Sequence, residues 1–180
     1  MNRSEIEIKL NRDRAWLLET IGGMPEDDVM KPATKSEGDP SKMWSAKDHL
    51  AHLIGIERWF NAMIRRHLDG DANPVGLRQD DKGNERTMDQ IMANVHRMNE
   101  LWVEEHRAKP LTHIIAIGQQ MRSETLELLA GLSDDQLLEK LPGAPWADGT
   151  IGGVLGANAD HGRMHWKWVK EGWGGGDAGG

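Results

Sequence analysis

The spacing of apolar residues is the feature that most constrains what this chain can fold into. Over long stretches these residues recur at every third or fourth position, and they do not alternate with polar ones. A repeat of three and four places apolar side chains on one face of an α-helix, whereas alternation is typical of a strand. Because no segment reads convincingly as a strand, we expect an all-α protein.

Residues that begin and end helices divide this pattern into segments. Ser45, Thr87 and Ser133 are each followed three positions later by an acidic or amide side chain, which is the arrangement of a capping box. A Gly-Gly pair ends the first helix, Pro110 separates two later ones, and the stretches rich in turn residues are predicted loops. We predict long helices over residues 4–21, 45–68, 87–107, 111–129 and 151–170, and a short helix or turn after Ser133.

The most economical arrangement of these helices is an up-and-down four-helix bundle with an additional helix inserted between its two halves. A short, weak internal repeat supports the division into two halves. "GGMPEDDVM" follows the first helix and "AGLSDDQLL" follows the fourth, and each precedes a tryptophan and a capped helix. A chain of 180 residues suits one domain. We expect that domain over residues 1–172, followed by a flexible glycine-rich tail at 173–180.

The composition excludes several classes of protein. The chain has no cysteine, so a transition-metal site must use histidine and carboxylate ligands, and a cysteine nucleophile is ruled out. The formal net charge is −7 with acidic and basic residues interspersed, which argues against a nucleic-acid partner. The first residues contain no apolar run long enough for a signal peptide or a membrane span. We therefore expect a cytoplasmic protein with no membrane partner.

Two histidines in the last predicted helix, within "DHGRMHWKW" at residues 160–168, raise the question of a metal site. His161 and His165 lie four positions apart and continue the apolar stripe of Ile151, Val154 and Leu155, so both should point into the bundle. A buried histidine must satisfy both ring nitrogens. The H-x-x-x-H spacing alone is a weak signal, and core or surface histidines remain alternatives.

A third ligand would come from the second long helix, which offers His49 and His52. With Ser45 as N-cap, Trp44 and His49 occupy the two positions that form a hydrophobic staple, so His49 has a structural role available. His52 has none, which makes it the better ligand. The other histidines are expected to be solvated or helix-end residues: His67, His96, His106 and His113.

The two stretches that carry these histidines resemble motifs of the DinB-like (damage-inducible) four-helix bundle superfamily. "WSAKDHLAHLIGIERW" resembles its second-helix motif, with a Trp-Ser start, a histidine before leucine and a glutamate five residues further on, and "DHGRMHWKW" resembles its last-helix H-x-x-x-H. The resemblance implies a metal site of His52, His161 and His165 and maps Glu57 onto the motif glutamate. The layout is also similar to the ClbS/DfsB branch, in which some members lack the metal histidines and one type is a protective cyclopropane hydrolase.

Three imidazoles can hold a divalent ion and leave positions open, an arrangement typical of catalytic rather than structural sites. Zinc or nickel suits this donor set, and such an ion lowers the pKa of a bound water or thiol. Asp48 and Glu57 lie about one helical turn on either side of His52 and are candidate catalytic residues. Helix capping by Asp48 and an arginine salt bridge with Glu57 are the structural alternatives.

The sequence thus favours a metal-dependent hydrolase or thiol S-transferase that acts on a small molecule, and the second substrate could be a low-molecular-weight thiol. Trp59 and Trp166 are candidates for the pocket wall, with core packing as the alternative. The alternatives for function are a non-enzymatic metal- or ligand-binding bundle, a ClbS-like protective hydrolase, and a purely structural bundle. The apolar helix surface is compatible with a homodimer.

Overall fold

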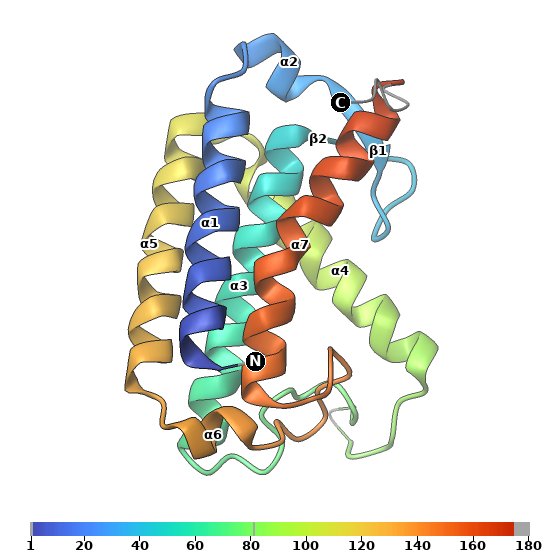
Figure 1. The fold of residues 1–180 in the computed structure, drawn as a ribbon. Coiled ribbons are helices and arrows are strands. Elements are labelled where there is room, and N and C mark those ends of the chain that lie inside the picture. Colours follow the sequence, from blue (N-terminus) through green and yellow to red (C-terminus); the bar gives the residue numbers. More distant parts are fainter. Residues whose placement is uncertain (1, 81, 175–180) are drawn as a thin grey trace.

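Five long helices dominate the computed structural model, which describes residues 2–80 and 82–174 (Figure 1). The long helices are α1 (Arg3–Gly22), α3 (Ala46–Leu68), α4 (Met88–Arg107), α5 (Leu111–Gly131) and α7 (Ile151–Gly172). Two short helices lie in the connections: α2 (Glu26–Met30) and α6 (Asp134–Leu138). The expected all-α class is confirmed.

Helices α1, α3, α5 and α7 pack side by side as a bundle, and α4 packs against α3 from outside (Figure 1). Each long helix reverses the direction of the one before it. Because α4 returns the chain between α3 and α5, these two helices run in the same direction. The four bundle helices therefore run up, down, down and up, and do not alternate as in the predicted up-and-down bundle, because the inserted helix adds one reversal between the two halves.

The helix boundaries follow from local capping chemistry. The side-chain oxygens of Ser45, Thr87 and Ser133 accept hydrogen bonds from the backbone N–H three positions on, and each box is closed by the reciprocal side-chain bond. A capping oxygen satisfies one of the N–H groups that a helix start leaves unpaired, which fixes where the helix begins. The predicted helix starts and ends agree with the structure to within about two residues because these signals are local.

The expectation that the chain contains no strand is wrong for one short segment. Strands β1 (Pro32–Lys35) and β2 (Met43–Ser45) pair as an antiparallel hairpin where a polar loop was predicted. The strands are too short for an alternating pattern to be visible, and their stability comes from distant contacts. Trp44 Nε1 donates to Glu100 Oε2 of α4 at 2.9 Å, and α7 passes directly over β1 at Gly172.

The interior consists of two apolar clusters with charged side chains between them. Along α1, Leu10 belongs to the first cluster and Leu17 to the second, and the buried Arg14 lies between them. Arg14 forms an ion pair with the buried Glu57 of α3, which also pairs with Arg122 of α5. The bundle is thus divided at mid-height by a buried ionic layer.

The last described residues belong to the packed structure. Trp173 caps α7, and its indole lies edge-on to Trp166 with ring centroids 5.9 Å apart. Trp173, which was expected to begin the tail, is thus packed, and positions 175–180 of the expected tail lie outside the described residues. None of the helices in the described part of the chain is long and apolar enough to cross a membrane.

Candidate metal centre

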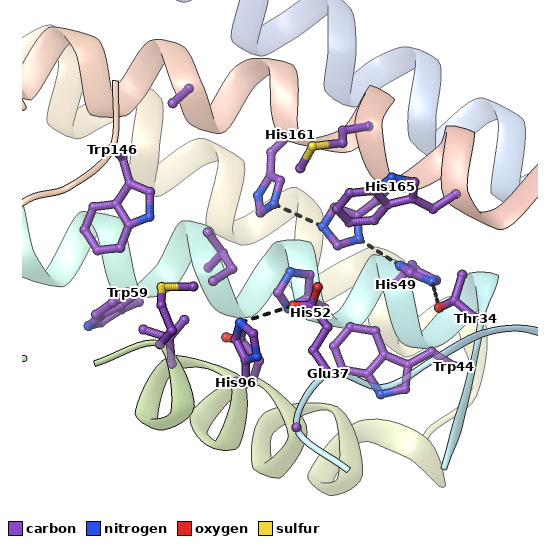
Figure 2. Close-up of a pocket in the computed structure, with 18 of the residues that line it drawn as sticks. Thr34, Glu37, Trp44, His49, His52, Trp59, His96, Trp146, His161 and His165 are labelled. Carbon is purple, nitrogen blue, oxygen red and sulfur yellow. Dashed lines mark hydrogen bonds and ion pairs between the residues drawn. The ribbon is translucent and has the colours of Figure 1, made fainter. Parts of the chain in front are cut away.

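The three histidines selected from the sequence meet in the structure. His52 comes from α3, and His161 and His165 come from successive turns of α7 (Figure 2). One ring nitrogen from each lies within 4.8 Å of the other two. Helices α3 and α7 are neighbours in the bundle, so the cluster joins two elements that are far apart in the chain.

The ring nitrogens of the cluster lie close together. The Nε2 atoms of His161 and His165 face each other at 3.0 Å, and the His52 ring lies 4.6 Å from that of His165, centroid to centroid. Nδ1 of His52 is buried and has no hydrogen-bond partner within the described ranges. An unpaired buried nitrogen is costly unless something satisfies it. Three converging imidazoles, one of them orphaned, fit a divalent transition metal.

Burial keeps these histidines neutral. It lowers the pKa of His161 to about 4. The pKa values of His52 and His165 are also lowered well below the ordinary value, first by burial and then by repulsion from the neighbouring histidines. Neutral imidazole is the form that binds a metal. The cluster is therefore ready to bind a cation at neutral pH.

His49 has a second contact that the sequence did not reveal. The predicted packing on Trp44 is present, with the two rings edge-on at 5.4 Å. In addition, Nδ1 of His49 lies 2.8 Å from Nδ1 of His165, and Nε2 of His49 lies 2.8 Å from the hydroxyl of Thr34 on β1 (Figure 2). His49 thus links the hairpin to a candidate metal ligand.

The two carboxylates predicted as catalytic candidates are engaged elsewhere. Asp48 Oδ2 accepts hydrogen bonds from the backbone N–H and the hydroxyl of Ser45 at 2.9 and 3.0 Å, which is the capping alternative. Neither Asp48 nor Glu57 is among the described residues that line the pocket beside the histidines.

Glu57 is fully buried in the ionic layer of the bundle. It forms ion pairs with Arg14 and Arg122 and accepts a 2.7 Å hydrogen bond from the hydroxyl of Thr125. Burial opposes the charge on Glu57, but the two arginines outweigh it and hold the pKa of this carboxyl below its usual range. This geometry is the arginine salt bridge that was the structural alternative for Glu57.

A pocket of about 1000 Å³ opens beside the histidine cluster, between α3, α4, α7 and the loop that precedes α7. Its wall is largely aromatic and apolar (Figure 2). The aromatic lining residues are Trp44, Trp59, Phe60, Trp146 and Trp168. Of the two tryptophans considered for the pocket wall, Trp59 lines the pocket, whereas Trp166 packs against the core. The sequence did not indicate Trp44, Trp146 or Trp168 as wall residues, because their neighbours come from distant parts of the chain.

The remaining histidines differ from one another. His113 is exposed, as expected. His96 lines the pocket, where its Nε2 lies 3.3 Å from Glu37 Oε2. His106 lies in the last turn of α4, as a helix-end residue, but it is buried and not solvated, with its ring 4.0 Å from that of Trp102 and its Nδ1 2.8 Å from the Trp102 carbonyl oxygen. Its charged sequence neighbours lie on the solvent face of α4, whereas His106 follows Val103 on the buried face.

The fold and the site together define a class of protein: a helical bundle with a three-histidine cluster beside an aromatic pocket. A profile of the DinB superfamily matches residues 9–169, and the chain belongs to this superfamily. The crystal structure of an uncharacterised protein from Escherichia coli UTI89 is similar, with a TM-score of 0.58 and 18% sequence identity over 94% of each chain. At that identity the likeness shows the fold alone. No curated protein matches the chain. The ClbS/DfsB branch stays a prediction.

Proposed function

We propose that this protein is a metal-dependent enzyme that acts on a small apolar molecule, as a hydrolase or a thiol S-transferase. The observation that carries the proposal is the position of His52, His161 and His165 at the wall of a large pocket. Three neutral imidazoles on one side and open pocket space on the other allow an ion to be held while a substrate approaches it.

Zinc and nickel are the metals that this donor set suits. When bound, such an ion supplies Lewis-acid chemistry, polarising a carbonyl group or lowering the pKa of a bound water or thiol. The protein's own residues hold and shield the centre. Trp44 packs against the His52 ring at 5.2 Å, and Trp168 packs edge-on against His165 at 4.7 Å. These indoles restrict the approach of water from the side.

The pocket indicates the class of substrate. Five of the nine tryptophan and phenylalanine side chains of the chain line it. Trp59 and Trp146 lie away from the histidines, with their rings edge-on at 5.1 Å (Figure 2), and the Phe60 ring packs against both. Aromatic walls favour flat apolar groups. We infer an elongated molecule whose apolar part lies against these rings and whose reacting polar group reaches the histidines.

The main alternative is a metal- or ligand-binding protein without catalytic activity. The engagement of Asp48 and Glu57 in capping and ion pairing favours it, because neither carboxylate is free to act as a general base. A ClbS-like protective hydrolase would share the fold and would not need the metal. The homodimer, the thiol partner and the cytoplasmic location remain expectations from the sequence.

Metal analysis followed by turnover assays tests the proposal. The protein is stripped with a chelator, reloaded with zinc or nickel, and its metal content is measured together with that of His52→Ala and His161→Ala. We expect about one ion per chain in the wild type and in the exposed control His113→Ala, and none in the two ligand variants. Failure of the folded wild type to bind either metal would overturn the metal site.

The loaded protein is then assayed with aryl esters, aryl amides, and a thiol donor paired with an aromatic electrophile. Ester or amide cleavage that depends on His52 supports the hydrolase, and consumption of the thiol supports the transferase. A protein that binds one ion but turns over none of these substrates favours the binding alternative.

A further inference from the structure

We infer that His49 and Thr34 are positioning residues that fix the tautomer and ring orientation of His165 for metal binding. The inference rests on the proposed three-histidine centre and goes beyond its ligands. It starts from a chain of close contacts that runs from the cluster to the hairpin (Figure 2).

The direction of each hydrogen bond in this series of contacts follows from the ligand role of His165. Its Nε2 faces His161, so this nitrogen must offer its lone pair to an ion, and the ring proton must then be on Nδ1. Nδ1–H of His165 donates to Nδ1 of His49 at 2.8 Å. The proton of His49 is consequently on Nε2, from which it donates to the hydroxyl oxygen of Thr34 at 2.8 Å.

A metal-binding histidine usually donates its second N–H to a polar partner, which fixes the ring and raises its basicity. A carboxylate or carbonyl commonly takes this part. Here a second imidazole takes it, and that imidazole needs a partner of its own to choose between its two tautomers. Thr34 supplies that partner, so all the nitrogens of His165 and His49 have a defined function.

Packing holds both positioning residues, His49 and Thr34, in place. His49 is buried, with the indole of Trp44 against one side of its ring. Thr34 follows Ala33 on β1, and this strand cannot move toward α7 because the backbone already touches Gly172. This packing restricts the movement of the acceptor toward α7, which helps to orient a ligand.

The staple role of His49 makes a different prediction and can be separated from this one. A staple needs only an apolar side chain against Trp44, which leucine supplies. The hydrogen-bonded series from His165 through His49 to Thr34, called the relay below, needs an acceptor near the position of His49 Nδ1. The side-chain oxygen of asparagine can lie at that position. We therefore compare His49→Leu with His49→Asn, and Thr34→Val with Thr34→Ser, and include His113→Leu as an exposed control.

Zinc affinity is measured by competition with a chromophoric chelator, and the folded state of each variant is checked by circular dichroism. We expect His49→Leu to weaken zinc binding about 10- to 100-fold. His49→Asn and Thr34→Ser should recover most of the affinity, and Thr34→Val should lose less than His49→Leu. The double variant His49→Leu/Thr34→Val should bind as His49→Leu does, because the hydroxyl acts through the imidazole.

Cobalt loading gives a second readout that does not depend on turnover. The visible absorption of the Co²⁺-loaded protein should shift in His49→Leu and return toward the wild type in His49→Asn. Unchanged zinc affinity and an unchanged cobalt spectrum in a folded His49→Leu would overturn the relay. Equal losses in His49→Leu and His49→Asn would overturn it as well. A wild type that binds no metal would instead refute the metal centre itself, so the two failures are distinguishable.

Discussion

The last turn of α7 passes so close to β1 that a Cβ atom on Gly172 would overlap the carbonyl oxygen of Ala33. The atom that would be met belongs to the backbone and cannot rotate away. Glycine at this position therefore allows the hairpin to lie on α7, and with it Thr34 near the histidine cluster.

The first prediction concerns this contact. Gly172→Ala should lower the free energy of unfolding by about 1–3 kcal/mol, because the strand or the helix end must shift. Urea denaturation measures the change. Gly131, the last residue of α5, has open space where a Cβ would be, so Gly131→Ala is the matched control and should leave stability equal or slightly higher. Equal stability of Gly172→Ala and the wild type would contradict the close approach.

The second prediction concerns the buried ionic layer. Glu57→Gln leaves Arg14 and Arg122 buried without their counter-charge, and should lower the free energy of unfolding by about 3–5 kcal/mol. The control is Glu124→Gln, which removes a partly exposed carboxylate 4.0 Å from Arg65 and should change stability by less than about 0.5 kcal/mol. Zinc bound per folded molecule should stay the same in both. A folded, stable Glu57→Gln that loses activity would instead assign Glu57 a part in the reaction.

The third prediction concerns pH and the metal-free protein. Histidine in an unfolded chain titrates near 6.5, whereas burial lowers the pKa of His49 and His161 to about 4 in the folded state. Between these values the unfolded chain binds more protons than the folded one, so the free energy of unfolding falls as pH falls from 6.5 toward 4. Each such histidine adds up to about 1.4 kcal/mol per pH unit to this slope.

Urea unfolding of the chelator-treated protein at pH 7, 6 and 5.5 measures the slope. The variant His161→Gln should show a flatter dependence than the wild type, and the exposed control His113→Gln should not. Parallel curves for wild type and His161→Gln would show that burial of His161 does not affect the acid stability.

The fourth prediction concerns the aromatic end of the pocket. Trp146→Leu should weaken binding of a neutral aromatic probe such as N-phenyl-1-naphthylamine about 2- to 10-fold, the loss of one aromatic contact. Trp16→Leu, which removes an indole packed against Arg163 outside the pocket, is the control. Zinc affinity should be unchanged in both variants, since neither indole contacts the histidine cluster. Equal probe binding in Trp146→Leu and the wild type would remove Trp146 from the substrate wall.

The parts of the structure that sequence could predict are the local ones. The starts of α3, α4 and α6 follow from a capping residue and a partner three positions away, so no distant contact is needed to place them. His161 and His165 share a face because they are four positions apart. The choice of His52 over His49 came from the staple and from resemblance to a family motif, and the structure brings His52 into the cluster.

The parts that sequence could not predict depend on residues far apart in the chain. The bond between His49 and His165 joins positions 116 apart, and the β1–β2 hairpin is held by contacts of Trp44 with α4 and of Ala33 with α7. The charged neighbours of His106 suggested a solvated side chain, because sequence does not show which face of α4 packs on α3. Glu57 was ambiguous for the same reason: its two arginines come from α1 and α5.

The sharing of the cluster between α3 and α7 has a consequence for unfolding. His52 and His161 are separated by 109 positions, and α4, α5 and α6 all lie in the chain between them. An ion held by both helices would close this segment into a loop, and the metal-bound protein would gain stability with each increase in free ion concentration. Proteolysis of the intervening segment would then become slower as metal becomes more available, so the lifetime of the protein would report the supply of its own ion.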